Sequence, residues 1–562
     1  MARRIRWQIV IAVLSTLLVT ALLGRLALRV TAEPSPLGGG RYIEAVVGAP
    51  VNPIPLLNNP LADPVGRDLI ALLFDGLMEI GADGMVQAGL AADVEVDESG
   101  TTYLFHLRRD VVWHDGRPFT ADDVVFTLRS LQVADEPGEP ALATFWQDVL
   151  VDRLDDYTVR VTLAAPYEPF LSLARVPILP AHLLAGVPPE QWPETPFAQS
   201  LVGTGPYRLV ELRDDRAILQ ANPDHEAFTG NLNRHPYIDR LELRFIAMPE
   251  AAMAALARGE VTAFGARLTP QSAPLELPAG LQATTLPLDE YTILSFNLRR
   301  QPLDEPPLRR ALAHGLSKDA LIEGPLRGSV APLDTPILPG WWWAASPDVT
   351  WYEADTAIAN RNLEELGFEA GISGVRQRDG NALRFELLVD GEPMRRAAAA
   401  EIARQWAEIG VAIEVVELDG PTLQQRLRDH NFDMALHSWA RLGPDPDPFA
   451  LWHSSRAEDG LNYAGLADKR IDDLLASART ERDLAARSAD YAAFQERWVE
   501  LAPSITLFQP LYRFASVESL GVDGGDEPGA NIYNILFGPE DRYRSISRWY
   551  TSSSLQIQGD LQ

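Results

Sequence analysis

The residue types that could carry covalent chemistry are few and scattered along this chain of 562 residues. It has no cysteine, which excludes thiolate nucleophiles, thiolate metal sites and disulfides. The nine histidines form no His-Glu-x-x-His motif and no pair at metal-ligand spacing. The sequence also lacks a Gly-x-Ser-x-Gly elbow and a Gly-Lys-Ser/Thr phosphate loop. We therefore predict no catalytic residue, no metal site and no cofactor.

Asp445 and Asp447 are neighbouring carboxylates, the residue type that glycosidases use in pairs. The chain has 78 acidic residues, so such pairs arise by chance and are weak evidence for hydrolysis. A secreted hydrolase with scattered catalytic residues stays open as an alternative, but the sequence nominates no residue for it.

The sequence gives better support to a binding site that is centred on Trp439. This tryptophan ends a predicted strand, Asp433–Trp439, and a proline-rich loop follows at Leu442–Pro448. Ligands of α/β lobes sit at strand ends, and binding clefts are often lined by aromatic side chains. We expect Trp439 to line a cleft, with burial in the core as the alternative.

Regularly alternating elements would position this tryptophan. Strands are predicted at Leu383–Val389, Val411–Glu417 and Asp433–Trp439, with helices between them at Arg396–Ile409 and Leu423–Asp429. A strand–helix–strand–helix–strand run indicates an α/β lobe with a largely parallel sheet.

The most informative stretch of the first half joins a strand, a turn and a capped helix. Apolar residues alternate in Tyr103–Leu107, as in a strand with two different faces. His114–Pro118 has the composition of a turn. Thr120 and Asp123 then form a capping pair for a helix predicted at Ala121–Leu131.

Four more segments complete the prediction. Pro64–Ile80 has one wide apolar face and predicts a helix. Glu33–Gly40 has the composition of a Pro/Gly linker, and the proline-dense Pro166–Pro196 predicts a surface excursion. A last strand is expected at Ile505–Leu511.

The N-terminus indicates export. Arg3, Arg4 and Arg6 precede the apolar run Ile9–Leu23. A basic start followed by such a run is typical of a signal peptide or a short membrane anchor. Because basic flanks stay cytoplasmic, everything after Val30 should lie outside the cytoplasm.

The pattern of the first half resembles the family-5 extracellular solute-binding proteins, the dipeptide and oligopeptide receptors of ABC importers. The matching residues are Phe105-His106-Leu107-Arg108, Trp113-His114-Asp115-Gly116 and Thr120-Ala121-Asp122-Asp123-Val124. Asp75-Gly76-Leu77 and Gly203-Thr204-Gly205-Pro206-Tyr207 also match, the latter as a turn between lobes. The resemblance extends in consistent order from Arg41 to Trp549.

This resemblance implies an α/β, two-lobed periplasmic-binding-protein-like fold of type II, with an extra small subdomain on the first lobe. The expected division is residues 1–32 as signal peptide or N-terminal membrane anchor, 33–40 as linker, 41–292 as lobe 1 including the small subdomain at about 90–200, 293–502 as lobe 2, and 503–562 as a C-terminal return to lobe 1.

The family's Gly-Trp-x-x-Asp segment lines the cleft, and its backbone bonds a peptide like an added strand. Here Ser438 replaces the glycine, Trp439 and Ala440 follow, and Leu442 stands where the family's Asp pairs with the peptide's amino terminus. Asp445 could take over that role if the loop is longer. Further cleft candidates implied by the resemblance are Asn462, Tyr463, Tyr512 and, on the small subdomain, Trp146.

The predicted function is that of an extracytoplasmic receptor. It would capture a peptide or peptide-like solute and deliver it to the membrane permease of an ABC importer. The formal net charge of −29 repels phosphate backbones and argues against nucleic acid as a partner. We expect a monomer. The rival of a different class is a membrane-anchored sensor or scaffold, which an uncleaved N-terminal helix would favour.

Overall fold

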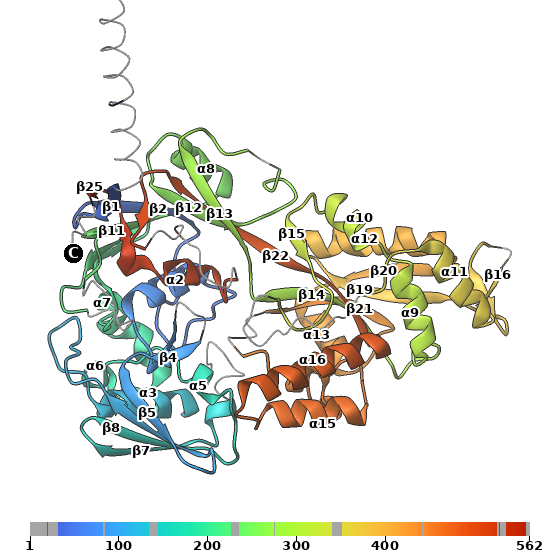
Figure 1. The fold of residues 1–562 in the computed structure, drawn as a ribbon, viewed down its shortest axis with the longest axis horizontal. Coiled ribbons are helices and arrows are strands. Elements are labelled where there is room, and N and C mark those ends of the chain that lie inside the picture. Colours follow the sequence, from blue (N-terminus) through green and yellow to red (C-terminus); the bar gives the residue numbers. More distant parts are fainter. Residues whose placement is uncertain are drawn as a thin grey trace, which may run out of the picture.

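The computed structural model describes residues 20, 32–81, 85–133, 144–225, 235–274, 276–339, 351–371, 373–440, 443, 445–524, 528 and 535–557. Two lobes lie side by side and share one long sheet (Figure 1). Within the described residues this sheet has 12 strands, in the order β20-β19-β21-β14-β22-β12-β2-β11-β10-β9, with β13 and β15 also paired to β22. The expectation of a two-lobed α/β fold is confirmed.

Lobe 1 contributes one half of this sheet. Its strands are β2 (Arg41–Val47), β9 (Tyr207–Arg213), β10 (Arg216–Ala221), β11 (Arg240–Ile246), β12 (Ala263–Arg267) and β13 (Leu281–Pro287). Helices α2 (Pro64–Leu73) and α8 (Pro249–Ala257) pack on it. Strand β22 (Ser504–Val517) crosses between the lobes: Ser504–Pro510 pairs with strands of lobe 2, and Leu511–Val517 with β12 and β13.

Lobe 2 contains the predicted alternation of strands and helices. Its strands are β14 (Glu290–Phe296), β15 (Val330–Pro332), β19 (Arg384–Asp390), β20 (Ala412–Leu418) and β21 (Met434–Ala440). Its longer helices are α9 (Pro306–His314), α11 (Thr356–Glu365), α12 (Pro393–Glu408), α13 (Gly420–Arg428), α15 (Lys469–Ala478) and α16 (Leu484–Leu501). Strand β19 runs parallel to both β20 and β21, as the alternation predicts.

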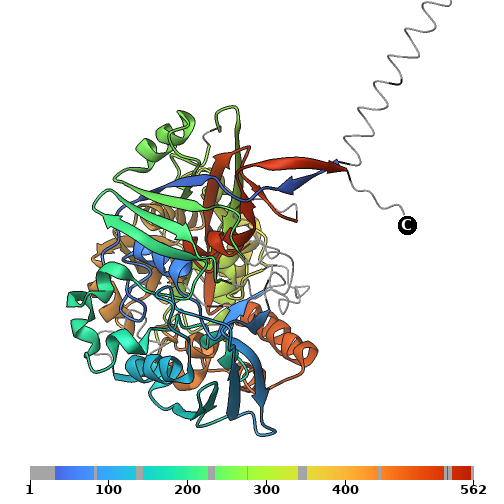
Figure 2. The same ribbon diagram turned by 90° about the vertical axis from the view of Figure 1, so that its left-hand side faces the viewer.

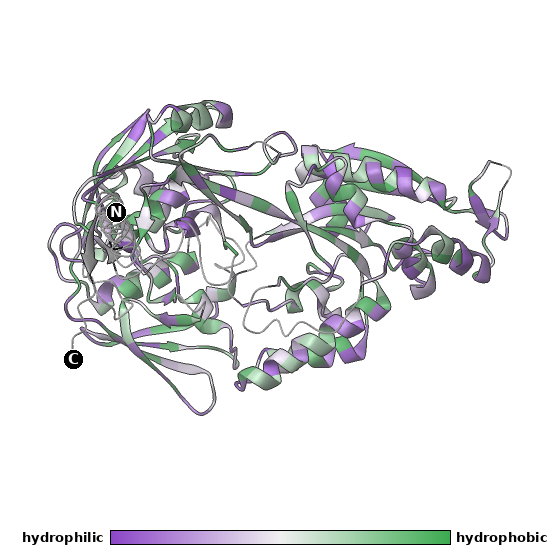
Figure 3. Cartoon of the chain, turned by 45° about the horizontal axis from the view of Figure 1, so that its top comes forward, coloured by the Kyte–Doolittle hydropathy of each residue, from purple (hydrophilic) through white to green (hydrophobic). Residues whose placement is uncertain are grey.

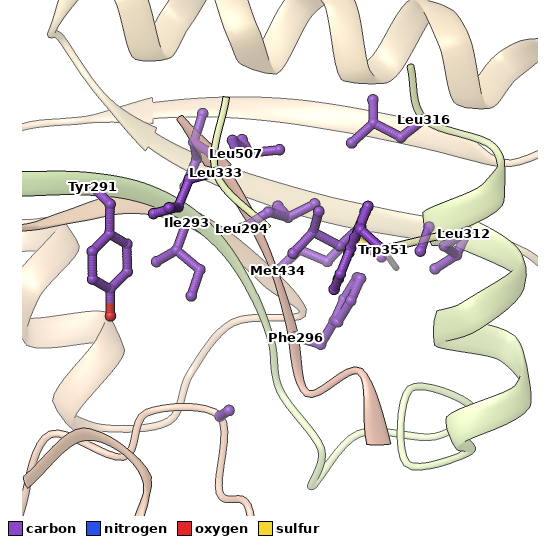
Figure 4. Close-up of a cluster of buried hydrophobic side chains, with 14 of the residues drawn as sticks. Tyr291, Ile293, Leu294, Phe296, Leu312, Leu316, Leu333, Trp351, Met434 and Leu507 are labelled. Atoms are coloured by element: carbon purple, nitrogen blue, oxygen red, sulfur yellow. The ribbon is translucent and has the colours of Figure 1, made fainter. Parts of the chain in front are cut away.

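The core of lobe 2 surrounds β14, all of whose residues are buried. Tyr291, Ile293 and Phe296 meet side chains from helices and neighbouring strands (Figure 4). Hydrophobic and hydrophilic residues interleave along the covering helices (Figure 3), as in amphipathic helices that pack on a sheet.

The small subdomain is a four-stranded antiparallel sheet on which helix α3 (Ala121–Val133) packs. Its strands, in the order β5-β6-β8-β7, are β5 (Ala91–Val96), β6 (Thr102–Leu107), β7 (Leu150–Asp155) and β8 (Thr158–Thr162). Strand β6 buries Tyr103, Phe105 and Leu107 on one face, as their alternation predicts. The Thr120 N–H donates to Asp123 at 3.0 Å, which is half of the expected capping pair.

Four predictions about single segments were wrong. The helix expected to reach Ile80 ends at Leu73, where the Gly205 N–H donates to the Leu73 carbonyl at 2.9 Å, and the chain turns into β3 (Met78–Ile80). Gly203–Tyr207 therefore joins the small subdomain to lobe 1 and is not a turn between the two lobes. Pro166–Pro196 is not a surface excursion, since its short helices α5 (Phe170–Leu173), α6 (Ala181–Leu184) and η1 (Pro189–Glu194) bury Phe170, Leu184 and Trp192.

The fourth wrong prediction concerns the expected linker, part of which forms a strand. Strand β1 (Ala32–Pro36) pairs antiparallel with β25 (Ser553–Ile557), and the pair projects from the body of the protein (Figure 2). The signal or anchor expected at residues 1–32 lies outside the described residues, apart from Thr20 and Ala32. In the described part of the chain, no helix has both the length and the apolar character of a membrane span.

Candidate functional site

A solvent-open hollow of about 150 Å³ lies where the two lobes meet at the hinge. The hinge consists of Leu288 and Asp289, which connect β13 of lobe 1 with β14 of lobe 2, and of Glu290, the first residue of β14. The lining comes from lobe 1 (Pro60, Leu61, Pro64, Arg267), the hinge (Leu288, Asp289, Glu290), lobe 2 (Ala440) and the C-terminal return (Phe537, Gly538, Pro539). Of the candidates from the sequence, the structure places Ala440 in this lining.

The hollow is polar on its hinge side. Arg267 donates to the Glu290 carboxylate at 2.6 Å. Asp289 accepts a hydrogen bond from the backbone N–H of Gly443 at 2.7 Å. The proline-containing loop of lobe 1 and Phe537 supply apolar surface. Apolar walls with a few convergent polar groups are the usual composition of a small-molecule site.

The end of β21 has an edge that no described strand covers. Strand β19 pairs with β21 only as far as Leu436, which lies opposite Val389. Beyond it, His437–Ala440 pairs with β14 on one side, and the described strands leave the other side open. An open edge of this kind can accept an extended peptide as an added strand.

Trp439 lies at this open end of β21 and is partly buried. Its ring stacks on Tyr463, with centroids 5.5 Å apart and an interplanar angle of 20°. It also packs against two hydrophobic clusters of lobe 2. One part of the ring therefore supports the core, and the rest is accessible at the strand end.

Ser438 belongs to a polar cluster that the sequence did not reveal. Its hydroxyl lies 3.0 Å from that of Thr292 and accepts a hydrogen bond from Arg395 at 2.9 Å. Arg395, in the first turn of α12, also bonds both carboxylate oxygens of Asp390 at 2.8 and 2.7 Å. Burial raises the pKa of Asp390, but the hydrogen bonds and charge of Arg395 outweigh burial, so the pKa stays below its usual value.

Position alone could have suggested this cluster. Asp390 ends a parallel strand and Arg395 begins the helix that follows it, which is where α/β lobes place ligand-binding groups.

Asp445 is not placed to receive a ligand amine in this structure. It is buried in lobe 2 and accepts a hydrogen bond from Arg487 at 2.7 Å. The Tyr491 hydroxyl lies 3.4 Å from the same oxygen. Because a guanidinium already compensates this carboxylate, a second cation would have to displace it.

Asn462 and Tyr512 are also inside the protein. The Asn462 side chain is fully buried and donates to the carbonyl groups of His453 and Leu466, which holds the turn before α15. Tyr512 is buried in lobe 1, next to Gly265 and beneath the Arg542 guanidinium. Their aromatic or amide character matches the family pattern, but their contacts are those of core residues.

Trp146 and Tyr463 differ from expectation in a similar way. Trp146 is fully buried in the core of the small subdomain, against Phe145 and Phe170, and does not face the cleft. Tyr463 is buried beneath Trp439, and its hydroxyl lies 3.3 Å from the Gln424 side chain. Tyr463 therefore supports Trp439 from below.

The small subdomain touches lobe 2 on the side away from the hinge. The Tyr167 hydroxyl donates to Asp447 at 2.9 Å, and Arg479 donates to the same carboxylate at 2.8 and 3.0 Å. The backbone N–H of Glu168 donates to the Arg479 carbonyl at 2.9 Å, and Arg482 donates to the Asp97 carbonyl at 3.1 Å. These contacts hold the ends of α15 and α16 beside the subdomain, as seen in Figure 1.

Histidines, aspartates and glutamates do not gather into a metal site in the described ranges, where no group of three or more could hold an ion. His114 of the family-like turn has a structural role. The Gly203 N–H donates to its Nδ1 at 3.1 Å, and its Nε2 lies 3.1 Å from the Gly205 carbonyl oxygen. Both ring nitrogens are thus used in joining the subdomain to lobe 1.

Comparisons with known proteins agree with this geometry. Residues 85–460 match the family model described as bacterial extracellular solute-binding proteins, family 5 middle. The oligopeptide-binding protein AppA of Bacillus subtilis is 26% identical over 511 residues, which cover 89% of this chain and 91% of that protein. The dipeptide-binding protein of Escherichia coli is 29% identical over 484 residues (78% and 85%). Protein XP55 of Streptomyces lividans is 30% identical over 478 residues (82% and 83%).

Solved structures share the fold. HbpA2 of Haemophilus parasuis superimposes with a TM-score of 0.74 at 22% identity, covering 92% of this chain and 100% of that one. AppA of Bacillus subtilis in complex with a nonapeptide gives a TM-score of 0.67 at 24% identity, covering 92% and 99%. At these identities the likeness establishes the fold.

Proposed function

The chain belongs to the bacterial extracellular solute-binding proteins of family 5, and we propose that it captures a peptide or peptide-like solute between its lobes and delivers it to the permease of an ABC importer. The observation that carries this proposal is the open edge of β21 beside the interlobe hollow. A peptide backbone can bond to such an edge whatever its side chains are, which suits a receptor for varied peptides.

In this proposal Ser438, Trp439 and Ala440 contact the ligand from lobe 2. The backbone of the strand end bonds the ligand's main chain, and the accessible part of the Trp439 ring packs on a ligand side chain. Arg395 and Asp390 hold Ser438 in place and add polar groups next to the edge. Hinge motion at Asp289 and Glu290 then closes lobe 1 over the ligand.

The receptor function is favoured over catalysis by the way the chain uses its reactive side chains. Asp445 and Asp447, the carboxylate pair that could suggest a glycosidase, are each bonded to an arginine. His437 is buried beside Ser295, and burial lowers its pKa to about 3, so it remains neutral and enclosed at physiological pH.

We place the protein outside the cytoplasm, as a monomer that is either released after signal cleavage or held by its N-terminal segment. Retention of that segment would favour the membrane-anchored sensor or scaffold as second candidate. N-terminal sequencing of the mature protein from its host separates the two forms. A mature chain that begins near Ala32 supports the released receptor.

Ligand-dependent thermal stabilisation tests the function itself. The purified protein is heated with a pool of di- to nonapeptides and, in parallel, with an oligosaccharide pool as the chemical control. A ligand at 100 times its Kd should stabilise the folded state by about 2.7 kcal/mol and raise the Tm. If no peptide raises the Tm, and native mass spectrometry finds no solute bound to protein from its host, the proposal is wrong.

A further inference from the structure

The C-terminal return passes between the two lobes at the hinge, and its side chains alternate between the two cores. Leu536 belongs to the hydrophobic cluster of lobe 1, whereas its neighbours Ile535 and Phe537 belong to the cluster of lobe 2. All three are buried: Ile535 and Leu536 are each 1% exposed, and Phe537 is 6% exposed. The return segment 535–537 therefore joins the cores of both lobes beside the hinge.

The backbone of Leu536 fastens this return segment to the hinge. Its N–H donates to the Pro287 carbonyl at 3.0 Å, and its carbonyl accepts from the Asp289 N–H at 2.6 Å. Leu536 thus forms a parallel bridge with Leu288, in the connection between β13 and β14. Since Leu536 also packs in the core of lobe 1, the return segment should stay with lobe 1 when lobe 2 rotates about the hinge.

Two guanidinium groups hold the ring of Phe537. That of Arg544 lies 5.4 Å from the ring centre, and that of Arg175, which follows α5 of the small subdomain, lies 5.3 Å from it. Guanidinium groups at this distance are attracted to the face of an aromatic ring. Asp541 fixes the arrangement further, because it accepts from the Phe537 N–H at 2.7 Å and pairs with Arg544 at 3.0 Å. The ring is thus held by groups outside lobe 2.

Phe537 also lines the hollow. It therefore contributes to the hollow and to the hydrophobic cluster of lobe 2, while its neighbours and its two arginines keep it with lobe 1 and the small subdomain. Rotation of lobe 2 away from lobe 1 would expose part of this shared apolar surface, which costs free energy in proportion to the exposed area. Residue 537 is thus placed to influence how far the lobes open.

We propose that Phe537 is a positioning residue of the hinge. It sets the balance between the open and closed arrangements of the lobes in the ligand-free protein, and the affinity for a solute in the hollow depends on that balance. The first part goes beyond the proposed function and needs no ligand. The second part rests on the proposed function, because it concerns the solute that closes the lobes.

Spin labels on two introduced cysteines test the first part, since the chain has no cysteine of its own. Leu150→Cys on the small subdomain and Lys469→Cys on lobe 2 use exposed positions: Leu150 is 66% exposed, and the Lys469 side chain is 85% exposed. Pulsed electron–electron double resonance then gives the distances between the lobes in the full-length, ligand-free protein. Phe537→Ala should raise the open-to-closed ratio by about tenfold. Phe537→Leu keeps a smaller apolar side chain and should raise the ratio by a smaller factor.

Leu536→Ala is the matched control, because it truncates the adjacent buried side chain, which belongs to the lobe 1 cluster. It should lower the Tm but keep the distances of the wild type, and thermal denaturation verifies that every variant is folded. Unchanged distances in both Phe537 variants, or an equal shift in Leu536→Ala, would overturn the inference.

A tripeptide pool added to the same labelled proteins tests the second part. The wild type should shift to the shorter distances, and Phe537→Ala should need about tenfold more peptide for the same shift. Equal peptide requirements in the two proteins would refute the coupling between Phe537 and the ligand. A wild type that does not respond to the pool, while Phe537→Ala opens the ligand-free protein, would support the positioning role and contradict the proposed peptide function.

Discussion

Tyr167 of the small subdomain and Asp447 of lobe 2 are 280 positions apart in the sequence, and a 2.9 Å hydrogen bond joins them on the far side of the cleft from the hinge. Arg479 completes the contact, since it bonds the same carboxylate and its guanidinium lies 5.1 Å from the centre of the Tyr167 ring. The two lobes are thus held together at both ends of the cleft. Closure of the two lobes therefore includes these polar contacts between the small subdomain and lobe 2.

Removing the Tyr167 hydroxyl should favour the open form. A hydrogen bond to a charged group is worth about 1.5–3 kcal/mol, so Tyr167→Phe should raise the open-to-closed ratio by about tenfold or more. Small-angle X-ray scattering of the ligand-free protein would show this as a larger radius of gyration. Tyr157→Phe is the control, because Tyr157 lies in the same subdomain and contacts Arg109 through its ring. Equal radii for the wild type and Tyr167→Phe would argue against an interlobe role.

Trp439→Ala should weaken ligand binding more than it weakens the fold. Truncating an aromatic contact at a binding site commonly costs about 2 kcal/mol or more of binding free energy. Trp406→Ala is the contrasting variant: Trp406 is fully buried, and its indole N–H donates to the Leu312 carbonyl at 2.9 Å. Its loss should lower the free energy of unfolding by about 3–5 kcal/mol. If urea titration shows a loss of that size for Trp439→Ala, Trp439 is mainly a core residue.

His114 should make the protein sensitive to acid. Burial lowers its pKa to about 4, against an ordinary value of 6.5, while the Gly205 carbonyl group acts in the opposite direction. Below pH 6.5 the unfolded chain binds a proton at His114, whereas the folded protein does not bind it until the pH nears 4. The free energy of unfolding therefore falls as the pH drops from 6.5 toward 4. The loss approaches about 3 kcal/mol.

Urea unfolding of the wild type and His114→Gln as a function of pH measures this effect. The variant should be less stable than the wild type at neutral pH, but its free energy of unfolding should change less between pH 6.5 and 4. Parallel curves for the two proteins would contradict the assignment.

Arg542 should be essential for the stability of lobe 1. It is buried between Glu44 and Asp68, with contacts of 2.8 and 2.6 Å. Arg542→Met would leave two buried carboxylates without their counter-ion, and breaking such a pair typically costs about 3–5 kcal/mol. Arg404→Ala removes an arginine that pairs with Glu401 and Glu408 on an exposed helix face and should change stability little. Similar melting temperatures for the two variants would refute this expectation.

Much of the fold was predictable from the sequence because its signals are local. Alternation in β6, the capping pair before α3 and the regular spacing of β19, α12, β20, α13 and β21 each depend on neighbouring residues. Ordered motifs also sufficed to identify the family. The prediction of a helix up to Ile80 was wrong: the helix ends at Leu73, whose carbonyl group accepts a hydrogen bond from Gly205, a residue far away along the chain.

The candidate binding site depended on tertiary structure more than the fold did. The sequence placed Trp439, Ser438 and Ala440 at a strand end, and they are there. It could not say that Asp445 and Asp447 are bonded to Arg487 and Arg479, or that Trp146, Asn462 and Tyr512 are buried, because ion pairing and burial depend on which distant segments meet. For the same reason, the hollow beside Asp289 and Glu290 is defined only once lobe 1, the hinge and the end of β21 come together.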